Sequence, residues 1–207
     1  MRSSWMIAAI SLALAACANS LNERTAQKYY AAGEQAAGQG DLAAARENYR
    51  RALINTQIGN LGPEYESQAA AKLARIQGNL CEYEEANKTF LFALGAKEKV
   101  VGSESPATFP LRVELAQLSF DTGHYSEAVS YYEKALAVGG SMLAAKAPLD
   151  YAEILDDYAA SLAYTGKKNE SESVKLQAEN LRKNSGATHE AIVKLKSAYV
   201  PYPKVCR

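Results

Sequence analysis

The sequence predicts an all-α protein in which about four helix-turn-helix units stack into a solenoid that ends in a C-terminal capping helix. Two observations support this prediction. A pattern of small and aromatic residues recurs along the chain, and its successive copies are 41, 42 and 43 residues apart. About half of the 207 residues are hydrophobic and 22% are charged, a composition typical of a folded protein with a sizeable core.

The recurring pattern follows each predicted turn. Its four copies are GDLAAARENYRRAL from Gly40, CEYEEANKTFLFAL from Cys81, GHYSEAVSYYEKAL from Gly123 and GKKNESESVKLQAE from Gly166. The sixth residue of each copy is small: Ala45, Ala86, Ala128 and Ser171. A preceding helical stretch carries another small residue twelve positions earlier: Gly33, Ala74, Ala116 and Ala159. Because facing small residues let two antiparallel helices approach closely, each unit is predicted to be a helical hairpin.

This arrangement resembles the tetratricopeptide repeat (TPR) family over about residues 26–183, with units similar to the longer ones of kinesin light chains. The resemblance implies a right-handed superhelical solenoid. We expect its helices to be broken at QIGNLGPE, GAKEKVVGSESPAT and GGSMLAAKAP. The fourth unit is polar, with Lys175 where the others have an aromatic residue, which is typical of a terminal repeat. The alternative is a non-repetitive helical bundle with a coincidental alanine spacing.

The first residues differ in composition from the rest of the chain. Arg2 precedes an apolar run from Trp5 to Ala16. As a helix this run rises only about 18 Å, less than the roughly 30 Å of a bilayer core. It therefore predicts a secretory signal peptide over residues 1–16 rather than a permanent transmembrane helix.

The residues Leu14-Ala15-Ala16-Cys17 resemble the lipobox of bacterial lipoproteins. This resemblance implies cleavage before Cys17 and lipidation of its thiol, with residues 17–25 forming the lipidated cysteine and a polar tether. Ala18 stands where an Asp often implies inner-membrane retention, so it favours the outer membrane, facing the periplasm. The alternative is an ordinary signal peptide, which would leave a soluble periplasmic protein with an incidental Cys17.

Residues 184–207 are predicted to form a capping helix from about Thr188 and an extended tail, VPYPKVCR, whose prolines disfavour helix. If Cys17 is lipidated, Cys81 and Cys206 remain as an even pair in an oxidising compartment. We expect a disulfide between them to pin the tail. The alternative is a buried Cys81 with a free or intermolecularly paired Cys206.

The sequence contains no nucleotide-binding or hydrolase motif. His124 and His189 have no second His or Cys at ligand spacing, so we expect neither a metal nor another cofactor. Adjacent carboxylates such as Asp156-Asp157 point about 100° apart on a helix, which indicates a solvated face rather than an acid/base pair. The 23 basic residues equal the 23 acidic ones, which gives no basic patch for nucleic acid. We expect a protein that is not an enzyme.

The TPR resemblance implies that the first helix of each pair lines a concave groove. Counting from the family pattern, the groove-facing residues are Tyr30, Glu34, Lys72, Arg75, Val113, Gln117, Asp156 and Ala160. Two cations lie in the middle of this set, which favours a peptide with central acidic character. We therefore expect a lipid-anchored adaptor or assembly factor for a pilus, secretion or peptidoglycan complex of the cell envelope. The alternative is a structural subunit of an envelope machine without a groove ligand.

Overall fold

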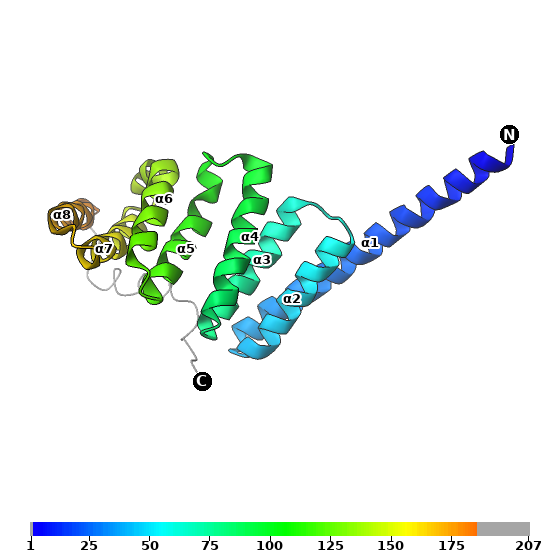
Figure 1. Cartoon of the computed structure of the whole chain (residues 1–207), viewed down its shortest axis with the longest axis horizontal. Helices are drawn as coiled ribbons and strands as arrows, with labels where there is room; N and C mark the ends of the chain where they lie inside the picture. Colours follow the sequence, from blue (N-terminus) through cyan, green and yellow to red (C-terminus); the bar gives the residue numbers. More distant parts are fainter. Residues whose placement is uncertain (1, 186–207) are drawn as a thin grey trace.

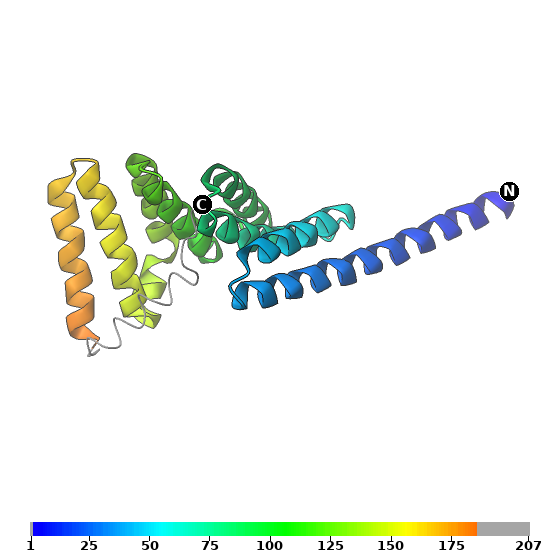
Figure 2. The same ribbon diagram turned by 90° about the horizontal axis from the view of Figure 1, so that it is seen from below.

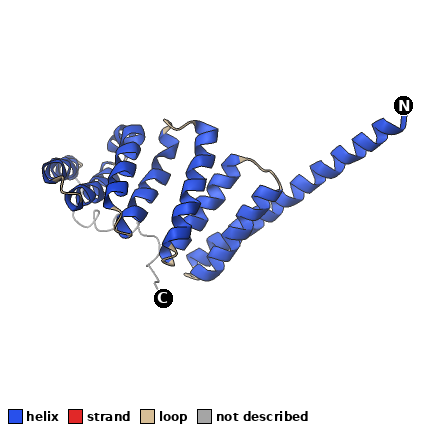
Figure 3. Ribbon diagram, viewed as in Figure 1, coloured by secondary structure: helices blue, strands red, loops and turns tan. Residues whose placement is uncertain are grey.

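The structure is a computed structural model that describes residues 2–185, with side chains from residue 20 onward. This part of the chain is helical throughout, apart from its connections, and contains no strand (Figure 3). The helices are α1 (Arg2–Gly38), α2 (Leu42–Ile58), α3 (Pro63–Asn79), α4 (Tyr83–Val101), the 3-10 turn η1 (Pro106–Thr108), α5 (Phe109–Asp121), α6 (Tyr125–Lys146), α7 (Pro148–Tyr164) and α8 (Lys168–Asn184).

The helices form four antiparallel hairpins, α1–α2, α3–α4, α5–α6 and α7–α8, which stack in chain order along an arc (Figures 1 and 2). Each hairpin packs on the next one, and α5 also touches both α3 and α7. The first helices of successive hairpins therefore lie side by side, as the predicted solenoid requires.

The core of residues 20–185 consists of four hydrophobic clusters arranged along the chain rather than one centre. Leu53 packs against the first two clusters, and Tyr131 packs against the second and third. Leu136 and Leu143 join the third cluster to the fourth. Stability is thus distributed over hairpins and their nearest-neighbour interfaces, as expected for a repeat protein.

The small residues that define the repeat occupy the helix crossings. Within each hairpin these side chains are 0–1% exposed: Ala45, Ala86, Ala128 and Ser171 on the second helices, and Ala74, Ala116 and Ala159 on the first. Gly33 is also buried, and a Cβ at this position would lie 2.8 Å from the ring of Tyr49. The packing predicted from the spacing is confirmed.

The turn within each hairpin has the same left-handed backbone. Gly40, Gly123 and Gly166 have φ angles of 77°, 78° and 82°, and Cys81 occupies the equivalent position with a φ of 61°. Left-handed backbone costs a non-glycine residue roughly 1–2 kcal/mol. Cys81 therefore occupies a position that glycine would fill without this conformational cost.

The break expected within GGSMLAAKAP falls at Ala147, near the end of that stretch, because α6 continues to Lys146 and α7 begins at Pro148. The two glycines are needed for packing rather than for a turn. A Cβ at Gly139 would lie 2.4 Å from the ring of Phe109, and one at Gly140 would lie 3.1 Å from the hydroxyl oxygen of Tyr151. Helix α6 can therefore pass close to the first helices of its own hairpin and of the next.

The longest connection joins α4 to α5 through residues 102–108 and is anchored by Arg112. The Arg112 guanidinium, 7% exposed as a residue, donates to the carbonyl oxygens of Ser103 at 2.8 Å and Lys134 at 3.1 Å. It also pairs with the Glu98 carboxylate at 3.1 Å. One buried side chain thus ties together α4, the connection and α6.

Helix α1 is continuous through residues 18–25, which the sequence assigns to a tether. The Glu23 carboxylate accepts a hydrogen bond from the Tyr65 hydroxyl at 3.0 Å, and Ala26 is only 3% exposed. A Cβ at Gly59 would lie 2.7 Å from the Cβ of Asn22. The first repeat therefore begins at about Asn22, a few residues earlier than expected. The helix expected from Thr188 lies outside the described residues.

Candidate partner-binding surface

Each odd-numbered helix carries a stripe of polar side chains spaced three or four residues apart, which places them on one helical face. The stripes are Glu23, Gln27, Tyr30 and Glu34 on α1, Gln68, Lys72 and Arg75 on α3, Glu114, Gln117 and Asp121 on α5, and Asp150, Glu153 and Asp157 on α7. Contacts between the stripes show that they lie next to one another. We call this surface the odd-helix face.

A ladder of polar contacts connects the stripes of successive hairpins. The Lys72 ammonium lies 2.9 Å from the Glu34 carboxylate, and Arg75 forms an ion pair with Glu114. Further along, the Gln117 side-chain amide donates to the Asp157 carboxylate at 3.4 Å. The ladder therefore runs from α1 across α3 and α5 to α7 and fixes the register of each hairpin on the next.

The carboxylates of this ladder experience different electrostatic environments. Burial raises the pKa of Glu114 above its ordinary value, although Arg75 and Lys72 oppose the shift. Partial burial also acts to raise the pKa of Glu34, but hydrogen bonds from Tyr49 and Lys72 outweigh it and lower that pKa. The Glu114 Oε2 atom is buried without a hydrogen-bond partner in the described part of the chain. Glu114 therefore depends strongly on Arg75 for compensation of its charge.

Tyr30 connects the ladder to a neighbouring pocket. Its ring packs edge-on against Tyr49, with ring centroids 5.6 Å apart and an interplanar angle of 74°. Burial raises the pKa of the Tyr30 hydroxyl, so this group stays protonated and can donate a hydrogen bond at neutral pH.

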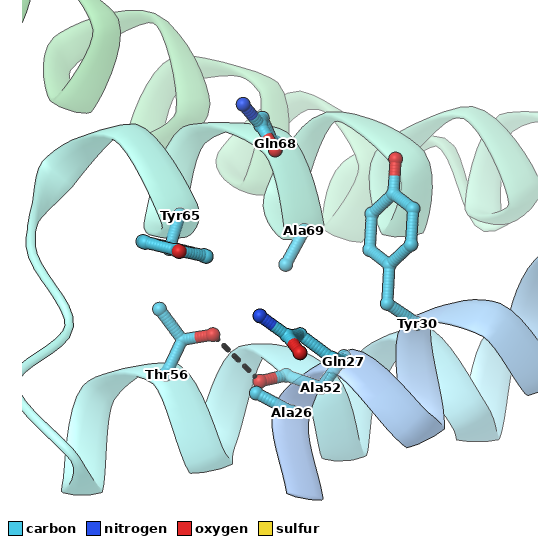
Figure 4. A pocket seen from close by; sticks show the side chains of 8 residues that line it. All are labelled: Ala26, Gln27, Tyr30, Ala52, Thr56, Tyr65, Gln68 and Ala69. Atoms are coloured by element: carbon cyan, nitrogen blue, oxygen red, sulfur yellow. Dashed lines mark hydrogen bonds between the residues drawn. The ribbon is translucent and has the colours of Figure 1, made fainter. Parts of the chain in front are cut away.

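The pocket lies where α1, α2 and α3 meet and has a volume of about 140 Å³ (Figure 4). Most of its floor is apolar, and the Thr56 hydroxyl donates to the Ala52 carbonyl oxygen at 2.9 Å. The side-chain amides of Gln27 and Gln68 extend from opposite sides (Figure 4). The lining residues are Ala26, Gln27, Tyr30, Ala52, Thr56, Tyr65, Gln68 and Ala69.

The structure places two of the expected groove residues off the odd-helix face. Val113 is 1% exposed and packs in the cluster around Tyr132, so it offers no surface to a partner. Asp156 pairs with Arg182 of α8, which directs its carboxylate toward the last helix instead of toward α5. The residues next to them, Glu114 and Asp157, occupy the positions on the odd-helix face.

Fixed offsets from the small residue of each first helix identify Glu114 and Asp157, which the family pattern missed. In the second hairpin, Lys72 and Arg75 lie two residues before and one residue after Ala74. The same offsets from Ala116 give Glu114 and Gln117, and from Ala159 they give Asp157 and Ala160. Tyr30, Val113 and Asp156 each lie three residues before the small residue of their helix.

The two cations in the middle of this surface are compensated by carboxylates. Lys72 and Arg75 are each paired with a carboxylate from a neighbouring hairpin, and each side chain is only 33% exposed. An acidic partner would have to compete with Glu34 or Glu114 for these cations.

The described residues bring no three His, Cys, Asp or Glu side chains together as a metal site. The Glu84 carboxylate lies 2.9 Å from the Lys88 ammonium on the same helix. The His124 Nδ1 atom lies 2.8 Å from the Thr122 hydroxyl oxygen, a contact within its own turn.

Cys81 is disulfide-bonded in the structure. Its expected partner, Cys206, lies outside the described residues, so the pairing of these two stays a prediction. Cys17 falls within α1, but the description of side chains begins only at residue 20. Lipidation of Cys17 likewise stays a prediction. None of the helices in the described part has the length and apolar character required to cross a membrane.

Several solved structures have an architecture similar to that of this chain. The crystal structure of BtubC (BKLC) from P. vanneervenii matches with a TM-score of 0.73 and 20% identity over 79% of this chain. A putative kinesin light chain of Podosopora anserina with nearly identical TPR-like repeats matches with a TM-score of 0.70 and 17% identity over 84% of this chain and 82% of that one. The fold is a TPR-like solenoid.

Another crystal structure, that of MamA, is similar to this TPR-like solenoid with a TM-score of 0.60 and 12% identity, over 77% of this chain and 80% of that one. The match to BtubC covers 65% of that protein's chain, slightly less than two thirds. No protein-family model matches the chain, and no curated protein matches it. The likenesses show the fold alone.

Proposed function

We propose that this TPR-like solenoid is a non-catalytic interaction protein that holds a segment of a partner protein on its odd-helix face. We further propose that a lipid on Cys17 anchors it in the bacterial cell envelope, where it serves as an adaptor or assembly factor. The observation that carries the first part is the pocket between α1, α2 and α3. It has an apolar floor, a polar rim and the ladder beside it, the combination typical of ligand sites.

The size of the pocket indicates what it would bind. A volume of about 140 Å³ is close to that of the roughly 150 Å³ apolar cavity that accepts benzene, so the pocket fits one aliphatic or aromatic side chain. The amides of Gln27 and Gln68 at the rim are suited to hydrogen bonds with a peptide backbone. We expect a peptide segment with one apolar anchor residue and polar neighbours.

Photocrosslinking in intact cells tests this site. A photoreactive amino acid replaces Gln68 at the rim, and in a control it replaces Glu172, whose side chain is 73% exposed on α8. We expect one dominant adduct from position 68 and none of that mass from position 172. Equal labelling at both positions would refute the assignment of the pocket.

A matched pair of substitutions then tests whether the adduct depends on the pocket. Gln27→Trp places an indole over the opening, whereas Gln35→Trp makes the same change at an exposed position two turns further along α1. We expect the adduct from position 68 to disappear with Gln27→Trp and to persist with Gln35→Trp. Loss of the adduct with both variants would point to an effect on α1 as a whole.

The membrane part of the proposal is supported by the lipobox resemblance around Cys17. Labelled fatty acid supplied to producing cells should enter the protein, and Cys17→Ser should abolish the label and release the protein from the membrane fraction. An unlabelled wild-type chain in the soluble periplasmic fraction would reduce the proposal to a soluble interaction protein. The identity of the crosslinked partner decides which envelope complex is served.

Exposed apolar side chains on α4 favour a second candidate function, that of a structural subunit held by side-to-side contacts. Leu91, Phe92 and Val100 are 43%, 40% and 46% exposed. A photoreactive residue at position 92 distinguishes the two functions. An adduct there that persists with Gln27→Trp, without any adduct from position 68, would favour the subunit.

A further inference from the structure

We propose that the C-terminal segment, residues 186–207, docks on the α5–α7 part of the odd-helix face and is held there by a disulfide between Cys206 and Cys81. This inference concerns an intramolecular ligand of the surface and goes beyond the binding of a partner protein. It follows from the position of Cys81, the reach of the segment and the charge of the two surfaces.

The disulfide has one possible partner within the chain. The protein has three cysteines, and Cys81 is bonded. Leu80 packs against the cluster that contains Ala36, so Cys81 lies beside the C-terminal end of α1. Cys17 lies about 30 Å from that end of the helix, at 1.5 Å per residue. Because bonded cysteines have Cα atoms within about 7 Å of each other, Cys206 remains as the partner.

The segment is long enough to reach Cys81. Helix α8 lies against α7, where Arg182 pairs with Asp156, so the segment starts beside the last hairpin. The α3–α4 turn is two hairpins away, a diagonal of about 30 Å for spacings of about 10 Å and a helix length of about 25 Å. The 21 residues from Ser185 to Cys206 span about 70 Å when extended, and about 50 Å when half of them are helical.

The charges of the segment complement the odd-helix face. The stripes of α5 and α7 contain five carboxylates, and Glu114 among them pairs with Arg75 of α3. Helix α6, on the other side of the same hairpins, carries two acidic and two basic residues and has no net charge. The segment itself contains one acidic residue, Glu190, and four basic residues: Lys194, Lys196, Lys204 and Arg207.

Geometry favours the same face. The hairpins stack along an arc (Figure 2), and α5 contacts both α3 and α7, so the odd-numbered helices form a continuous path. A segment on this path ends at the α3–α4 turn, close to the C-terminal end of α3. The pocket lies at the other end of α3, around Tyr65 and Gln68, and stays accessible to a partner.

Zero-length carbodiimide crosslinking of the full oxidised chain tests the docking, because it joins a lysine only to a carboxylate in direct contact. We expect links from Lys194 or Lys196 to Asp121, Glu153 or Asp157, and we expect Cys206→Ser to reduce their yield several-fold. Links confined to carboxylates of α4, α6 or α8, or no links at all, would overturn the docking. A disulfide-linked dimer on a non-reducing gel would overturn the intramolecular bond.

Reoxidation kinetics provide an independent test that depends on charge. The double variant Lys194→Glu/Lys196→Glu is compared with Lys183→Glu, a change on α8 upstream of the segment. After removal of the reductant, docking should raise the effective concentration of Cys206 at Cys81. We expect the double variant to re-form the disulfide several-fold more slowly than wild type, and the control to match wild type. Equal rates for all three proteins would show that the segment is tethered without docking.

Discussion

Reversing the charge of Arg75 tests the ladder that connects the hairpins. In wild type, Arg75 pairs with Glu114, and their side chains are 33% and 19% exposed. Arg75→Glu leaves the Glu114 carboxylate without its cation and places a second carboxylate beside it. Exposed ion pairs contribute at most about 1 kcal/mol, whereas breaking a buried pair costs about 3–5 kcal/mol. For this partly buried pair we expect a loss of about 2–4 kcal/mol in the free energy of unfolding.

Thermal and urea unfolding followed by circular dichroism measure this loss. In a chain of this size, 1 kcal/mol corresponds to about 2–4 °C, so Tm should fall by about 5–15 °C. The charge-swapped variant Arg75→Glu/Glu114→Arg restores an ion pair and should recover most of the loss, which a double-mutant cycle reports as coupling. A Tm for Arg75→Glu within 2 °C of wild type, or no recovery in the double variant, would refute the reasoning.

Three further predictions concern the core and the pH response. Val113→Ala removes two buried methyl groups and should lower the free energy of unfolding, measured by urea titration, by about 1–2.5 kcal/mol. The crosslinks from the pocket should not change. A loss below about 0.5 kcal/mol would contradict the burial of Val113. Gly33→Ala gains about 1 kcal/mol of helix propensity, but the added methyl group overpacks the Tyr49 ring at a cost of about 1–3 kcal/mol. We therefore expect net destabilisation. A Tm higher than that of wild type would be inconsistent with this contact. Hydrogen bonds from Lys97 and Gln68 lower the pKa of Glu64 in the folded protein. The ionised Glu64 carboxylate therefore contributes under about 1 kcal/mol to the free energy of unfolding at pH values above its pKa in the unfolded chain. This contribution is lost as the pH falls through the pKa of Glu64 in the folded protein. Glu64→Gln should therefore flatten urea-midpoint profiles in this acidic range, and an unchanged slope would argue against the shift.

The helix crossings could be predicted from the sequence because they depend on residue size at fixed spacing. Ala45, Ala86 and Ala128 have no room for a larger side chain, and this constraint is visible without coordinates. Gly139 and Gly140 of α6 likewise lie where an added side chain would contact a neighbouring ring too closely. Glycine marks both turns and close approaches, and only the rings of Phe109 and Tyr151 show that these two glycines mark close approaches.

The odd-helix face could be predicted only in part, because one residue along a helix turns a side chain by about 100°. Val113 and Glu114 are adjacent, yet one lies in the core and the other in the ladder. The pairing of Arg75 with Glu114 was not foreseeable from a single helix, since it depends on how far the next hairpin is displaced. The pocket depends in the same way on the angle between α1 and α3.

The ladder and the pocket should make unequal contributions to the proposed binding of a partner. A carboxylate from a partner that reaches Lys72 or Arg75 displaces Glu34 or Glu114, so one ion pair replaces another and the net gain is small. An apolar side chain that enters the pocket displaces only water and gains about 25 cal/mol for each Å² it buries. Affinity should therefore come mainly from the pocket, whereas the Glu34–Lys72 pair of the ladder holds α1 and α3 at the spacing that keeps the pocket open. On this reasoning, charge changes in the ladder weaken binding by altering the geometry of the hairpins, and the swapped pair that restores stability should restore binding with it.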